Sequence, residues 1–173
     1  MGEAGTVAGD APRTVYRLRV VLAEISPMIW RQLEVPAALS LAQLQEVPQA
    51  SFAWSGEHLH RFTVHGPEFG SGQLGLADPS TVRLADLGLR HRERFTYAYD
   101  FFSPLGCWRH DLRVEAITPL RPRRRYPWCG GGARTAPPED CGGPEAFLET
   151  DQNRGRSHQS SSWSTGCWHS RGQ

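Results

Sequence analysis

The chain has 173 residues, a length that suits a single domain, and it is 39% hydrophobic and 21% charged. It has no apolar run near the length of a membrane span and no basic-then-apolar leader, so we expect a cytoplasmic protein with no membrane partner. The net charge of +1 lacks the basic excess usual in nucleic-acid-binding domains, so nucleic acid is not the expected partner.

The first half of the chain predicts a hairpin followed by a helix. Residues 15–24 and 29–35 alternate between apolar and polar side chains on either side of a Ser-Pro turn, as two paired strands would. Ser40 and Gln43 then fit a capping box, which predicts a helix from 41 to about 53. Pro48 lies inside that helix, so we expect the helix to be kinked or weakened there.

The middle of the chain predicts further strands. Residues 58–65, 95–101 and 108–116 alternate, and we expect the last of these to be the final strand. Between them, the glycine-rich residues 68–80 predict a loop, and residues 84–89 a short helical turn closed by Gly88. A hairpin, a crossover helix and more strands predict an α+β fold, with a β-grasp-like sheet packed on one main helix.

The segment 126–143 reads YPWCGGGARTAPPEDCGG. Its glycines and prolines predict a shaped loop rather than a helix or a central strand, with a helix starting near Pro144. Residues 151–173 contain no aliphatic side chain, so we expect disorder there. The predicted organisation is a flexible N-terminus (1–14), one domain (15–149) and a disordered or aberrant tail (150–173).

An ordered set of short motifs resembles a known family. The motifs are ISPMIWR (25–31), HLHRF (58–62), YDF (99–101), WRH (108–110), YP-x-C (126–129) and PPEDCGG (137–143). Together they are similar to the Ri-plasmid (pRiA4b) Orf-three-like family, also known as transposable-element passenger (TnpR-like) proteins, over about residues 15–148. The resemblance implies a bacterial, plasmid- or transposon-associated accessory protein and implies no particular reaction. The chain departs from the family pattern after about residue 150, and we hypothesise a frame-shifted or truncated reading there.

A metal site is the sharpest chemical hypothesis. Residues two apart on a strand point the same way, so His58 and His60 are expected to share a face, with His110 on a nearby strand. Imidazole and thiolate suit zinc, and Cys129 and Cys141 bracket the glycine-rich loop. The alternative is that these histidines are core side chains bonded to backbone. If the histidines are core side chains, we expect no cofactor. If they form the metal site, the cofactor is zinc.

Acid–base chemistry and simple binding are the other interpretations. Glu139 and Asp140 with His110 or Asp100 could transfer protons, although the adjacent carboxylates could equally cap a helix. We expect a binding module rather than an enzyme, with an unknown protein or small molecule as its partner. The alternative is a zinc-binding protein or metal-dependent enzyme. The candidate binding residues are His58, His60, Asp100, Trp108, His110, Glu139 and Asp140.

Overall fold

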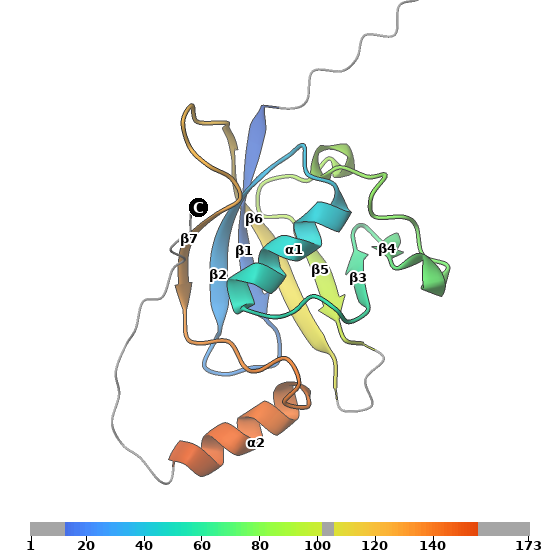
Figure 1. The fold of residues 1–173 in the computed structure, drawn as a ribbon. Helices are drawn as coiled ribbons and strands as arrows, with labels where there is room; N and C mark the ends of the chain where they lie inside the picture. Colours follow the sequence, from blue (N-terminus) through green and yellow to red (C-terminus); the bar gives the residue numbers. More distant parts are fainter. Residues whose placement is uncertain (1–12, 102–105, 156–173) are drawn as a thin grey trace, which may run out of the picture.

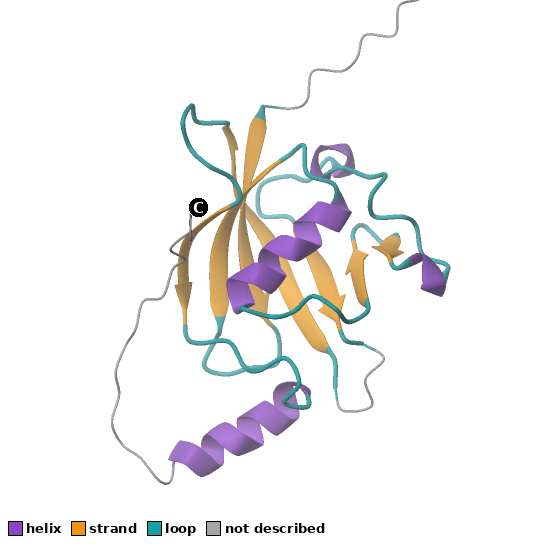
Figure 2. Cartoon of the chain, in the orientation of Figure 1, coloured by secondary structure: helices purple, strands orange, loops and turns teal. Residues whose placement is uncertain are grey.

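One antiparallel sheet with a helix across one face forms the centre of the fold (Figures 1 and 2). The structure is a computed structural model that describes residues 13–101 and 106–155. Within these residues the seven strands are ordered β4-β3-β5-β6-β1-β2-β7. The strands are β1 (Thr14–Leu22), β2 (Trp30–Pro36), β3 (His60–Thr63), β4 (Glu68–Gly70), β5 (Arg94–Tyr99), β6 (Trp108–Pro119) and β7 (Trp128–Ala133). The helices are α1 (Leu41–Phe52) and α2 (Gly143–Gly155), with short 3-10 turns at Gly72–Leu74 and Leu84–Leu87.

The alternating segments form the centre of the sheet. β1 pairs with β2 in an antiparallel hairpin, as predicted, and Leu18 lies opposite Leu33. On its other side β1 pairs with β6, and the register shifts by one residue between Arg17 and Leu18. Because each of these strands faces the core on one side only, its apolar residues recur with a period of two.

The capping box at the start of α1 is confirmed. The Ser40 hydroxyl accepts a hydrogen bond from the Gln43 backbone amide at 3.2 Å, and the Gln43 side chain accepts one from the Ser40 amide at 3.0 Å. Pro48 lies within the helix, which nevertheless runs on to Phe52 before Ala53 takes a left-handed conformation with φ 60°. The expected weakness at Pro48 therefore does not end the helix.

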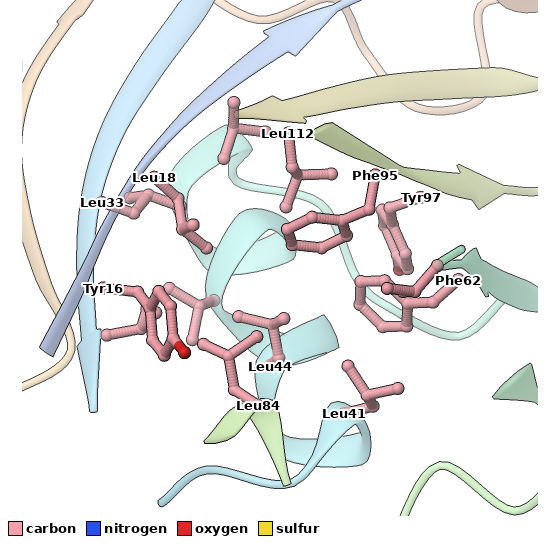
Figure 3. Packing of buried hydrophobic residues seen from close by; sticks show 14 of the residues in the cluster. Tyr16, Leu18, Leu33, Leu41, Leu44, Phe62, Leu84, Phe95, Tyr97 and Leu112 are labelled. Carbon is pink, nitrogen blue, oxygen red and sulfur yellow. The ribbon is translucent and has the colours of Figure 1, made fainter. Parts of the chain in front are cut away.

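The core lies between α1 and the inner face of the sheet (Figure 3). Leu41 and Leu44 of α1 are fully buried, and so are Phe62 of β3 and Tyr97 of β5. The 3-10 turn at Leu84–Leu87 adds Leu84 to this cluster and closes at Gly88, as the sequence predicted.

The glycine-rich segment contains a strand, which the sequence analysis missed. Trp128–Ala133 pairs with β2 as β7, at the edge of the sheet. A side chain at Gly132 would lie 2.8 Å from the Trp30 carbonyl oxygen, so glycine permits the close approach. Residues 68–80, also expected to be a loop, likewise contain the short edge strand β4. Because β7 follows β6 in the chain, the prediction that residues 108–116 form the final strand is wrong.

The α+β class is confirmed, since an antiparallel sheet is combined with two helices. The β-grasp-like arrangement and the single main helix are not confirmed, because the described sheet has seven strands paired only antiparallel and α2 is a second helix. The helix expected near Pro144 begins at Gly143 and continues to Gly155, into the predicted tail. Residues 1–12 and 156–173, for which flexibility or disorder was predicted, lie outside the described residues.

Among the helices described here, neither is long and apolar enough to cross a membrane.

Candidate functional site

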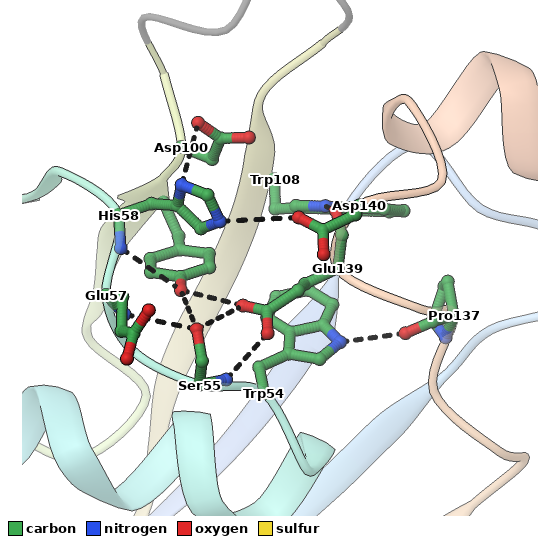
Figure 4. A network of polar contacts seen from close by, with 10 residues as sticks. Trp54, Ser55, Glu57, His58, Asp100, Trp108, Pro137, Glu139 and Asp140 are labelled. Carbon is green, nitrogen blue, oxygen red and sulfur yellow. Dashed lines mark hydrogen bonds and ion pairs between the residues drawn. The ribbon is translucent and has the colours of Figure 1, made fainter.

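Residues 137–143, which we call the PPEDCGG segment, are fastened to the domain by two tryptophans (Figure 4). Trp54, just after α1, donates its indole N–H to the Pro137 carbonyl at 2.7 Å. Trp108, at the start of β6, donates its indole N–H to the Glu139 carbonyl at 2.8 Å. Both indoles are buried, and their rings pack together with centroids 5.2 Å apart. Buried donors that bond to two carbonyls of the segment, two positions apart, give it a defined conformation.

Glu139 is the polar anchor of the PPEDCGG segment. Its carboxylate accepts hydrogen bonds from the Ser55 amide at 2.8 Å, the Ser55 hydroxyl at 3.1 Å and the Tyr99 hydroxyl at 2.8 Å. Burial by itself raises the pKa of Glu139, but these hydrogen bonds and the nearby His58 outweigh burial and leave the pKa below its ordinary value. Glu139 is therefore held as a carboxylate by the fold.

His58 lies at the surface between two carboxylates. Its Nδ1 is 3.6 Å from Asp100 Oδ1, at the end of β5, and its Nε2 is 3.4 Å from Asp140 Oδ1, in the PPEDCGG segment. The imidazole meets the Tyr99 ring edge-on, with centroids 5.4 Å apart. The Asp140 side chain is 81% exposed and that of His58 is 38% exposed. This arrangement can present negative charge and one imidazole to a partner in solution.

His110 is a core residue rather than a surface ligand. It is fully buried on β6, with its ring 5.2 to 5.3 Å from the rings of Phe52, Trp54 and Tyr97. Its Nδ1 lies 3.3 Å from the Tyr97 carbonyl oxygen, and within the described part of the chain its Nε2 has no hydrogen-bond partner. Burial lowers the pKa of His110 to about 4, so the ring is neutral at ordinary pH.

His60 does not share a strand face with His58, because His58 precedes β3, which starts at His60. His60 lies opposite Tyr99 in the sheet, and burial lowers its pKa. The expectation that the two histidines project side by side from one strand is therefore wrong. Sequence alternation located the strand but not the residue at which it begins.

The candidate zinc ligands are not assembled. Cys129 lies on β7 at one edge of the sheet, opposite Leu33 of β2, whereas Cys141 lies in the PPEDCGG segment. Burial raises the pKa of Cys141, which favours the neutral thiol over a metal-binding thiolate. Among residues 13–101 and 106–155, no group of three or more His, Cys, Asp or Glu side chains could hold a metal ion.

Three residues of this site were not singled out by the sequence analysis. Tyr99 had appeared only as the first residue of the YDF motif, and neither Trp54 nor Ser55 was a candidate site residue. These residues meet Glu139 or Pro137 from 40 to 84 positions away in the chain. The YDF motif could have pointed to Tyr99 as a site residue, because Tyr99 is its first residue. No motif or pattern in the sequence pointed to Ser55.

The fold and the site together define a small α+β domain that presents an acidic segment anchored on tryptophans. The chain belongs to the family of plasmid pRiA4b ORF-3-like proteins, whose sequence model matches residues 14–170. The match extends beyond residue 148, where the resemblance was expected to end.

Known proteins similar to the chain include one from Sinorhizobium fredii and one from Methanosarcina mazei. The chain is 30% identical over 144 residues to the uncharacterized protein y4hQ of Sinorhizobium fredii, covering 79% of this chain and 71% of that protein. It is also similar to the crystal structure of MM3350, a protein of unknown function from Methanosarcina mazei Go1. That comparison has a TM-score of 0.72 and 30% identity, and it covers 80% of both chains.

Proposed function

We propose that this chain is a non-catalytic binding module, an accessory protein of a plasmid or transposable element. On this proposal it binds a positively charged group of a protein or small molecule on the surface around His58. That surface comprises His58, Asp100 and Asp140. The observation that carries the proposal is the position of the His58 imidazole between two carboxylates, one of them 81% exposed.

The state of the potential reactive groups supports binding over catalysis. The Glu139 carboxylate is occupied by hydrogen bonds from Ser55 and Tyr99. His110 is enclosed by aromatic rings, and its pKa is lowered to about 4. Burial raises the pKa values of the Cys107 and Cys141 thiols, which makes both weak nucleophiles. A general base or nucleophile needs a pKa near the operating pH and an accessible position.

The attachment of the PPEDCGG segment supports a preformed binding surface. The two indoles and the Glu139 carboxylate hold the backbone of the segment close to the end of α1, to β5 and to β6, and this places the exposed Asp140 side chain 3.4 Å from the His58 imidazole. A surface that is already ordered loses less conformational entropy on binding. Exposed carboxylates attract a guanidinium or ammonium group and increase its rate of encounter.

A titration with a short arginine-rich peptide tests the proposal. The purified full chain is titrated at low salt and followed by amide and imidazole NMR signals, with Asp100→Asn plus Asp140→Asn as the variant. We expect saturable shifts centred on His58 and a loss of affinity of about tenfold in the variant, since each exposed ion pair contributes a factor of a few. Asparagine suits the left-handed backbone at Asp100 (φ 55°), so the fold is retained.

Glu46→Gln is the matched control, because Glu46 is an exposed carboxylate on α1 away from this surface. An unchanged affinity in the double Asp variant, or an equal loss in Glu46→Gln, would overturn the proposal. Metal analysis of the same protein tests the metal-dependent alternative. Stoichiometric zinc that is lost on His58→Ala would favour that alternative over a simple binding module.

A further inference from the structure

Three arginines lie side by side on the outer face of the sheet, the face turned away from α1. Arg113 of β6 is directly opposite Arg19 of β1 on one side and Arg94 of β5 on the other. Their sequence neighbours, such as Leu112 and Phe95, are buried in the core, so the arginines project outward. Like charges directly opposite one another in a sheet repel, which makes this an unfavourable arrangement without an anion.

Within the described residues, the carboxylate of Glu115 compensates part of this charge. It accepts hydrogen bonds from the Arg19 guanidinium at 3.3 Å and from the Gln32 side-chain Nε2 at 2.7 Å, and it lies 3.6 Å from the Arg113 guanidinium. The Arg19 guanidinium also stacks on the Trp30 ring, 4.0 Å from its centroid. Arg19 is therefore well compensated, whereas Arg113 is left with a share of one carboxylate.

Arg92 and Arg94 are less compensated still. Both are exposed, and in the described parts of the chain neither side chain has an ion pair or hydrogen bond. Arg92 is held in the turn before β5 by its backbone amide, which donates to the Val114 carbonyl at 2.8 Å. The turn therefore sets Arg92 against β6, close to the arginine row.

These side chains surround a hollow in the surface. Its volume is about 550 Å³, and it is lined by His91, Arg92, Arg94, Arg113, Val114 and Glu115. Three arginines and one glutamate give the lining a formal charge of +2 with His91 neutral, compared with +1 for the whole chain. The hollow is wide enough for a small ligand but open to solvent, so it is a shallow surface site rather than an enclosed pocket. The positive charge is thus concentrated at one shallow site.

We propose that this hollow binds a small ligand through a multiply charged oxyanion group, such as a phosphate ester or a diphosphate. Arginine guanidinium groups present paired N–H donors that match phosphate oxygens. An oxyanion between Arg94 and Arg113 converts their repulsion into two attractive contacts. The site lies apart from the surface around His58 and does not depend on the function proposed for that surface.

The surroundings favour a small ligand over a nucleic acid. Further along the same strand, Arg109 lies 3.5 Å from a Glu24 carboxylate oxygen and 3.6 Å from one of Asp111. The positive charge therefore does not continue as a stripe along β6. Nucleic-acid binding needs an extended set of phosphate contacts, which a local cluster does not supply.

Calorimetric titration of the full chain with pyrophosphate at low ionic strength tests this proposal. We expect saturable one-to-one binding, with weaker binding of inorganic phosphate. Arg94→Gln and Arg113→Gln should each reduce the pyrophosphate affinity about tenfold, as expected for loss of a charged hydrogen bond. Arg125→Gln is the control, because it removes the same charge from an exposed position in the loop before β7.

A second measurement separates lost binding from misfolding. Because Arg94→Gln removes a like-charge contact, the melting temperature of the ligand-free variant should not fall below that of the parent chain. The proposal is overturned if pyrophosphate gives no saturable heat, or if Arg125→Gln weakens binding as much as Arg94→Gln. Salt-sensitive binding of duplex DNA without binding of pyrophosphate would also overturn it.

Discussion

The buried histidine of β6 should make the stability of this domain fall as the pH falls. Burial lowers the pKa of His110 from 6.5 to about 4. Between these two values the unfolded chain holds a proton on His110 and the folded chain does not. The free energy of unfolding therefore decreases as the pH drops through this window, at about 1.4 kcal/mol per pH unit for this group. The total contribution is about 3 kcal/mol and is fully lost near pH 4.

Replacing His110 by phenylalanine isolates this effect. The phenyl ring takes the place of the imidazole among Phe52, Trp54 and Tyr97 and binds no proton. Near pH 7 we expect stabilities within about 1 kcal/mol, because the side chains are similar in size. At pH 4 His110→Phe should have gained about 3 kcal/mol relative to the parent chain.

The assay is urea unfolding followed by circular dichroism, for both proteins, at intervals from pH 7 to pH 4. Contributions from His60, whose pKa burial also lowers, are present in both proteins and cancel in the difference. Parallel stability curves for parent and His110→Phe over this range would refute the reasoning. An imidazole signal of His110 that titrates near pH 6.5 in the folded protein would refute it as well.

Three other substitutions test how the fold is held together, each by urea unfolding. Trp108→Phe removes the indole donor and leaves the Glu139 carbonyl without its hydrogen bond. We expect the free energy of unfolding to fall by about 2–4 kcal/mol. A fall below about 0.5 kcal/mol would contradict the role given to Trp108. Pro48→Ala should stabilise the domain by about 1–2 kcal/mol, because it restores an interior hydrogen bond of α1, and a loss of stability would show that the proline ring packs usefully. Gly70→Ala should destabilise the domain by about 1–3 kcal/mol, since the new Cβ would lie 2.5 Å from a backbone oxygen of β3. Gly72→Ala is its control: the new Cβ would have nothing within 4 Å, so the free energy of unfolding should change by no more than about 0.5 kcal/mol.

Sequence reasoning succeeded where local chemistry dictates local structure. The strands β1, β2, β5 and β6 each have one face in the core, so their apolar residues alternate visibly. The start of α1 was predictable because Ser40 and Gln43 satisfy each other's backbone groups within one turn. Such signals need no knowledge of distant contacts.

Sequence reasoning failed where backbone pairing or contacts between distant residues decide the structure. β7 contains three consecutive glycines from Gly130 to Gly132, which show no side-chain pattern, and an edge strand needs a partner on one side only. The candidates His58, Asp100 and Asp140 do meet in space, but nothing local to them shows that Asp140 reaches His58 from 82 positions away. The sequence also could not show how deeply His110 is buried, because an inward-facing residue can lie at the rim or in the centre of a core.

The position of β1 in the sheet has a consequence for how this domain forms during synthesis. β1 is made first, yet one of its two neighbours is β6, which is complete only at Pro119. Until the ribosome has passed that point, β1 lacks its β6 partner, and the nascent chain cannot bury the apolar side chains of the sheet. Pairing across so long a stretch of polypeptide is slow and leaves the unfinished product prone to aggregate. A gene copy interrupted anywhere upstream of β6 should therefore yield a product that is degraded rather than a smaller working domain.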